Sequence, residues 1–221
     1  MVYANYIAVH ESWRSGDIAR AFARKLEEIL REIFEEYRGT VFEVEKFDKK
    51  RVEEISNYLK SQQKETREFY STEDRNEIRK FLRISWYQTI GCKIFLHRGK
   101  KEPLVCRSPC LDPDLPVENW GNEEEEYWLM WYNKQDDFQD FSRDEELWND
   151  AVRCVYIEIL AKSLVESFPN VAEQYWKHAN AAVDRTLHAT DGQEICLGRF
   201  LDRHDGTLLS EWYKLGINVP I

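Results

Sequence analysis

Residues 123–133 read Glu-Glu-Glu-Glu-Tyr-Trp-Leu-Met-Trp-Tyr-Asn. Four carboxylates are followed by six large side chains, and this order fits no single secondary-structure period. An amphipathic helix repeats its apolar residues every 3.6 positions, whereas a half-buried strand alternates them. The pattern leaves a helix and a strand equally open for this segment.

The same segment lies within the most acidic part of the chain. Residues 112–150 hold fourteen Asp and Glu, including Asp136 and Asp137, against two Lys and Arg, which is a net charge of −12. Residues 1–111 carry +4 and residues 151–221 carry −2. Four of the eight tryptophans also fall in the acidic part: Trp120, Trp128, Trp131 and Trp148.

Carboxylates and large aromatic side chains in one segment indicate a surface that attracts and then holds a basic partner. Clustered negative charge raises the rate of encounter with a cationic surface, and Trp and Tyr dominate binding hot spots. The alternative is equally physical: the glutamates form a solvated face and the aromatic rings belong to the core. The residues expected to contact a partner are Trp120, Glu123, Glu124, Glu125, Glu126, Tyr127, Trp128, Trp131, Tyr132, Asp136 and Asp137.

Composition bounds the class of protein. A chain of 221 residues with 43% hydrophobic residues can bury a sizeable core, which excludes a disordered chain. The N-terminus lacks the features of a signal peptide, and no apolar run reaches the ~20 residues of a membrane span. Five cysteines without a tight framework favour a reducing compartment, so we expect a cytoplasmic location. The net charge of −10 disfavours direct binding to nucleic acid.

The remaining periodicity predicts an α+β fold that is mostly helical. We expect about six helices, with N-terminal signals at Ser15, Asp48, Ser71, Ser142, Asn170 and Thr207. Short strands are expected at residues 2–9 and 40–47, and one β-hairpin near residues 92–106. Gly91 and Pro169 predict two helix ends.

Pro109, Pro113 and Pro116 mark the best candidate boundary. We therefore expect an α+β N-terminal part at 1–111, the acidic aromatic segment at 112–150 and a helical part at 151–221, within one compact domain overall.

Three weaker constellations suggest other chemistry. Cys92, His97, Cys106 and Cys110 surround the expected hairpin, and thiolates with imidazole are zinc ligands, although none of the spacings is a Cys-x2-Cys knuckle. Buried structural thiols are the alternative, and we expect no cofactor.

Arg199 and His204 form an Arg-x4-His pattern that is similar to the one found in HEPN ribonucleases. In that family the His acts as acid or base and the Arg stabilises phosphate charge, without a metal. Residue 200 is Phe rather than a polar residue, and Asp205-Gly206 indicates a turn, so the match is incomplete.

Trp13, Arg14 and Ser15 lie between an expected strand and a helix N-terminus. Free backbone amides at such a junction bind anions, so a phosphorylated small ligand is a third alternative. Ordinary helix capping explains the same residues.

The leading hypothesis is therefore a non-enzymatic, cytoplasmic interaction module of the inhibitor, immunity or adaptor type, with a basic protein as its partner. A nucleic-acid mimic is one special form of it. The alternatives are the ribonuclease and the binder of a phosphorylated ligand.

Overall fold

A single mixed sheet organises the chain. The computed structural model describes residues 1–4, 18–62, 71–109, 116, 120, 124–133 and 141–201. Seven described strands form the sheet: β1 (Val2–Tyr3), β2 (Thr40–Glu45), β3 (Lys93–His97), β4 (Glu102–Pro103), β5 (Val105–Pro109), β6 (Glu124–Tyr132) and β7 (Ile195–Gly198). Their order is β1-β2-β6-β3-β4, with β5 also paired to β6 and β7 to β3.

Strand β6 lies at the centre of this sheet. Its residues 127–132 pair antiparallel with β2 along one edge. Along the other edge, Lys93 and Ile94 of β3 pair with Trp131 and Met130, and β5 then continues the line from Val105 opposite Trp128. The segment that was open between helix and strand is thus the longest strand of the sheet.

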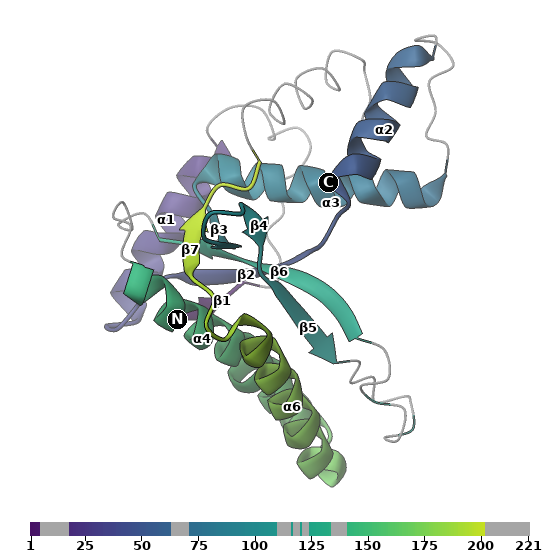
Figure 1. The fold of residues 1–221 in the computed structure, drawn as a ribbon. Coiled ribbons are helices and arrows are strands. Elements are labelled where there is room, and N and C mark those ends of the chain that lie inside the picture. Colours follow the sequence, from purple (N-terminus) through teal and green to yellow (C-terminus); the bar gives the residue numbers. More distant parts are fainter. Residues whose placement is uncertain are drawn as a thin grey trace.

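Helices cover both faces of the sheet. Helices α1 (Ile18–Ile33), α2 (Lys49–Ser61) and α3 (Thr72–Ile90) lie on one side. The other side is covered by a continuous helical segment made of α4 (Phe141–Arg153), the π-helix η4 (Cys154–Ala161) and α5 (Lys162–Ser167). The short 3-10 helix η5 (Pro169–Val171) connects it to α6 (Ala172–Thr190). In Figure 1, α2 and α3 lie above the sheet and α4 and α6 lie below it.

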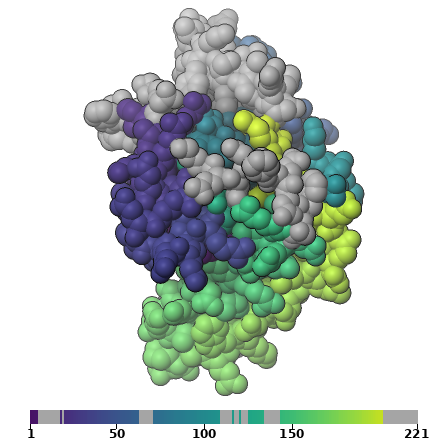
Figure 2. All heavy atoms as spheres, turned by 90° about the vertical axis from the view of Figure 1, so that its left-hand side faces the viewer, coloured from purple at the N-terminus to yellow at the C-terminus, as the bar shows by residue number. Residues whose placement is uncertain are grey.

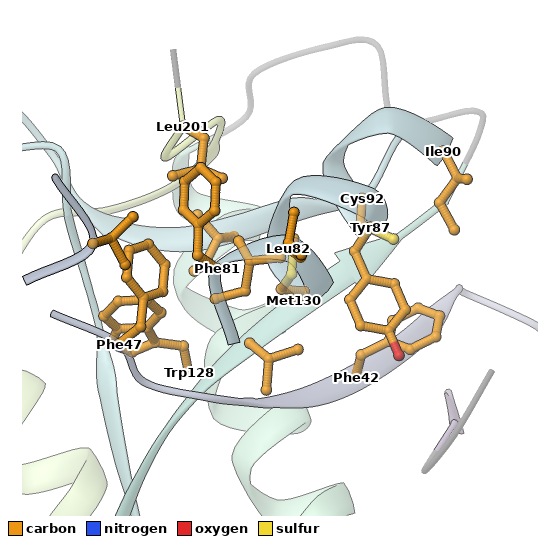
Figure 3. Packing of buried hydrophobic residues seen from close by; sticks show 14 of the residues in the cluster. Phe42, Phe47, Phe81, Leu82, Tyr87, Ile90, Cys92, Trp128, Met130 and Leu201 are labelled. Carbon is orange, nitrogen blue, oxygen red and sulfur yellow. The ribbon is translucent and has the colours of Figure 1, made fainter. Parts of the chain in front are cut away.

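Two hydrophobic cores result, one on each face. Figure 3 shows the first, where Phe47 of the loop after β2, Phe81 of α3 and Trp128 of β6 come together. The Phe47 ring packs edge-to-face on the Trp128 ring, with 5.4 Å between the ring centroids. The second core places Trp131 of β6 with Trp148 of α4 and other side chains from the lower helices. Because β6 is buried on both faces, its apolar residues are continuous rather than alternating.

Local signals fix the ends of several helices. The Asp48 carboxylate accepts hydrogen bonds from the amides of Lys50 and Arg51, and the Ser71 hydroxyl accepts one from Asp74. Gly91 ends α3 with a φ of 109°, a left-handed conformation that glycine adopts without steric cost. These N-caps and this C-cap lie where the sequence predicts them.

The α+β class is confirmed, and the details differ from the expectation. The described residues form five long helical rods rather than six helices, and seven strands rather than about four. The hairpin exists as Leu96 opposite Pro103 and His97 opposite Glu102, but β5 then leaves it to pair with β6. The expected helix at residue 207 lies outside the described residues.

Strands from all three expected parts of the chain pair in one sheet. β2 comes from the N-terminal part, β6 from the acidic aromatic segment and β7 from the C-terminal part. Within the described ranges, no helix combines the length and the apolar character needed to cross a bilayer.

Candidate functional site

The tryptophans of the acidic aromatic segment are core residues. Trp120, Trp128 and Trp131 have exposed fractions of 3%, 4% and 1%, and Tyr132 has 7%. Trp120 stacks on Tyr175 of α6 at 4.4 Å between ring centroids. The prediction that these rings form an exposed contact surface is therefore wrong. For Trp128, Trp131 and Tyr132 the physical reason is the two-sided burial of β6, which sends alternate side chains into opposite cores, whereas Trp120 precedes β6 and is buried against α6.

The exposed carboxylates of Glu125 and Glu126 in β6 are engaged by neighbouring groups of the same chain. The Lys46 ammonium donates to Glu126 at 2.6 Å, and Arg107 lies 3.9 Å from the same carboxylate. The hydrogen bond from Lys46 is the main reason that the pKa of Glu126 lies below its ordinary value. Tyr127 donates its hydroxyl to Glu125. Glu123, Asp136 and Asp137 lie outside the described residues, as does the side chain of Glu124.

An open hollow of about 590 Å³ adjoins this ion pair. Its lining residues are Lys46, Phe47, Asp48, Lys49, Glu77 and Glu126. The two ammonium groups and three carboxylates leave a formal charge of only −1. Asp48 and Glu77 are already used at the start of α2, where the Asp48 amide donates to Glu77. The hollow therefore offers a ligand little charge selectivity.

The structure separates the expected zinc ligands. Cys92 packs in the core below α3, whereas Cys106 packs in the core on the opposite face of the sheet. One metal ion cannot bind both thiols across a strand layer, so the four-residue zinc site is wrong. Cys110 lies outside the described residues, and the part of the chain that is described holds no other cluster of three metal-binding side chains.

The other two alternatives fall largely on residues without a described structure. Arg199 is exposed and directly follows β7, so it does not share a helix with His204 as the ribonuclease pattern requires. His204 lies outside the described residues. So do Trp13, Arg14 and Ser15, and the proposed anion site stays a prediction.

A half-buried carboxyl group that the sequence did not single out lies under η4. Glu43 of β2 points to the same face as Val41 and accepts a hydrogen bond from the Tyr3 hydroxyl at 3.4 Å. Burial raises the pKa of Glu43 to about 7, and the nearby negative charge of Glu125 adds to this rise. A carboxyl group with such a pKa exchanges its proton near neutral pH.

The groups around Glu43 come from four other elements. Tyr3 of β1, Tyr127 of β6, Cys106 of β5 and Tyr156 of η4 each interact electrostatically with it. Burial raises the pKa of the Cys106 thiol, so the thiol is neutral and not a nucleophile. The buried Tyr156 side chain lies beside Cys106 and interacts with its thiol. The cluster can hold a proton but supplies no activated nucleophile.

Among the residues that the structure describes, helix α1 carries the most extended exposed apolar surface. Ile18, Phe22, Ile29 and Ile33 have exposed fractions of 41%, 49%, 40% and 64%. They follow one another at spacings of four, seven and four residues, which places them on one helix face. Phe34, directly after the helix, is also exposed, at 49%. Figure 2 shows the purple-to-indigo atoms of this helix at the molecular surface.

The face of α1 that meets the protein is mostly small and polar, with the half-buried Leu30 beside it. Ala23 and Glu27 are buried, Glu27 accepts two hydrogen bonds from Arg31, and Arg31 also donates to Asn133 after β6. Arg20 donates to the carbonyl of Thr89 at the end of α3. The apolar row points about 120° away from this contact face, from 100° of rotation per residue. We call the row formed by Ile18, Phe22, Leu26, Ile29 and Ile33 the outer stripe.

The sequence shows the spacing of the outer stripe but not its direction. A helix with apolar residues on one side normally turns that side inward, and the signal that opposes this rule is the pair Ala23 and Glu27 opposite the stripe. No protein-family model, curated protein sequence or solved structure matches this chain in the three comparisons made.

Proposed function

We propose that this protein is a non-enzymatic interaction module that docks a helix of a protein partner on the outer stripe of α1. A single observation carries the proposal: α1 turns its small, polar face to the protein and its apolar face to solvent. Leaving such a row in water has a free-energy cost that a partner helix would remove, at about 25 cal/mol for each Å² covered.

The concentration of exposed apolar side chains supports this choice. Five of the eight large hydrophobic side chains that are exposed in the described structure lie in residues 18–34. The other three, Tyr58, Ile159 and Phe168, are on separate elements. Scattered exposed residues are normal on a protein surface, whereas a continuous row marks an interaction site.

The contact surface thus moves from the acidic aromatic segment to α1. The rings of Trp128 and Trp131 are unavailable, and Glu126 is already paired with Lys46. A cytoplasmic location stays part of the proposal, because Cys92, Cys106, Cys154 and Cys196 are free thiols.

The test uses a photoreactive residue introduced at position 29 of the full chain, with position 159 as the matched control. Both native residues are isoleucines with similar exposure, 40% and 39%, but Ile159 lies in η4, away from the stripe. Cross-linking in the source cell identifies the protein held at position 29. Binding is then measured with the two purified proteins.

We expect the combined substitution Phe22→Glu and Ile33→Glu to weaken that purified interaction by at least about 100-fold, since it places two charges in an apolar contact. Ile159→Glu should leave the affinity within about threefold. An equal effect of both changes, or cross-linking that does not favour position 29, would refute the proposal.

A further inference from the structure

We infer that the partner of the outer stripe is a second copy of this chain, bound through α1 in antiparallel orientation. The inference rests on the proposed function of this surface and names its partner. It is carried by the order of charges along the helix. In an antiparallel copy of the helix, the opposite charges come to face one another.

The two ends of α1 carry opposite charge. Arg20, Arg24 and Lys25 are exposed in its N-terminal half. Glu28 and Glu32 are exposed in its C-terminal half, and Glu35 and Glu36 follow directly after the helix. A parallel pair would place basic residues against basic and acidic against acidic, whereas an antiparallel pair brings the basic half onto the acidic half of the second copy.

The apolar residues define one register for such a pair. Phe22, Leu26, Ile29 and Ile33 follow the four-three-four spacing of a helix–helix seam. When the copies run antiparallel, Phe22 lies opposite Ile33 of the second copy, and Leu26 lies opposite its Ile29. The two-fold axis then passes close to Glu28, and each apolar contact occurs twice.

The same register places an ion pair beside the seam. With rotation about the helix axis counted from Ile18, the outer stripe spans about 0–80°. Lys25 and Glu32 lie beside it at about 320–340°, on the side that points away from the protein. Lys25 then faces Glu32 of the second copy, and symmetry repeats the pair. Both side chains are exposed. The one ion pair described for Lys25 joins it to the exposed Glu28, with 3.1 Å between nitrogen and oxygen. A surface bridge of this kind exchanges partners at little cost.

Sedimentation velocity of the purified full chain tests the inference first. We expect a monomer–dimer equilibrium with a dissociation constant of about 1–100 µM, because a single helix pair buries an area near the lower limit for specific protein interfaces. Phe22→Glu with Ile33→Glu should give a monomer over the same range, and Ile159→Glu should dimerise like the unaltered chain.

Charge reversal tests the register. Lys25→Glu alone and Glu32→Lys alone each turn two attractive contacts into two repulsive ones, so each should weaken dimerisation by about tenfold. An equimolar mixture of the two variants restores both ion pairs and should form a heterodimer as tight as the native dimer. Recovery in the mixture also shows that neither variant is misfolded. Lys177→Glu, an exposed change of equal charge on α6, is the control and should have no effect.

The outcomes are distinct. A dimer that the Phe22 and Ile33 substitutions leave intact, or a variant mixture that fails to recover, overturns the antiparallel pairing. If the chain stays monomeric at ~100 µM while position 29 cross-links to another protein, the second-copy inference fails and the proposed function stands. If no partner of either kind depends on the outer stripe, both fail.

Discussion

Replacing Glu43 by glutamine should stabilise the protein above pH 7 and leave its stability almost unchanged near the ordinary glutamate pKa of 4.5. Glutamine keeps the shape of the side chain and an oxygen that accepts from Tyr3, but it never carries a charge. The change therefore isolates the cost of holding an ionised carboxylate beneath η4.

The magnitude follows from the pKa of Glu43. The group binds a proton up to about pH 7 in the folded state and up to about 4.5 in the unfolded state. Across this interval the folded state holds one more proton, so stability falls as pH rises, at about 1.4 kcal/mol for each pH unit. The total is about 3 kcal/mol, and partial contact with solvent reduces it to about 2 kcal/mol.

The assay is urea denaturation of both proteins at a series of pH values between about 4.5 and 8, the interval across which Glu43 changes charge. The difference in the free energy of unfolding should grow from near zero to about 2 kcal/mol. Glu45→Gln is the matched control on the same strand, because Glu45 is more exposed and pairs with Arg83 at 2.7 Å. That control should lower stability by less than about 1 kcal/mol.

A difference between Glu43→Gln and the native protein that is the same at every pH would refute this reasoning. It would mean that Glu43 has the same charge in the folded and unfolded states, so that burial does not disfavour its ionised form.

Two further substitutions test the packing around the sheet. Gly39→Ala should lower the free energy of unfolding by about 1–3 kcal/mol, since a methyl group at this position overlaps the Trp131 indole. Gly99→Ala is its control, because no atom lies within 4 Å there, and an equal loss at both positions in thermal unfolding would exclude the steric explanation. Asp144→Ala should also cost about 1–3 kcal/mol, because it removes the buried acceptor of the Leu197 amide, 3.0 Å away. Hydrogen exchange at Leu197 should then accelerate, whereas Asp150→Ala, which breaks the exposed pair with Arg38, should leave it unchanged.

The boundaries of α2 and α3 were the most predictable ones, whereas the cap expected at Asn170 is not found, since α6 begins after Val171 without a side-chain cap. Ser71 and Gly91 define both ends of α3, and Asp48 defines the start of α2, through contacts to residues four or fewer positions away. Strand β7 was not predicted, because Ile195 to Gly198 is short and gains its place only by pairing with β3 about 100 residues earlier. A contact of that sequence separation leaves no local pattern.

The candidate surfaces divide in the same way. The row Ile18, Phe22, Ile29 and Ile33 is visible in the sequence as a helical repeat, but its exposure depends on Ala23 and Glu27 packing inward. Nothing in the sequence indicated that Glu43 is buried, because its burial requires Tyr3, Cys106 and Tyr156 from elements that only the tertiary fold brings together.

Three features of this protein follow from its sequence alone: the two ends of α3, the α+β class and the separation of charge along α1. Each of these depends on residues within a turn or two of one another, whose propensities and hydrogen bonds act before the chain is compact. Only the tertiary structure decided that residues 124–132 form a strand and that its indoles are buried. Burial is a property of both faces of β6, and those faces are covered by α3 and α4, which come from opposite sides of it in the sequence.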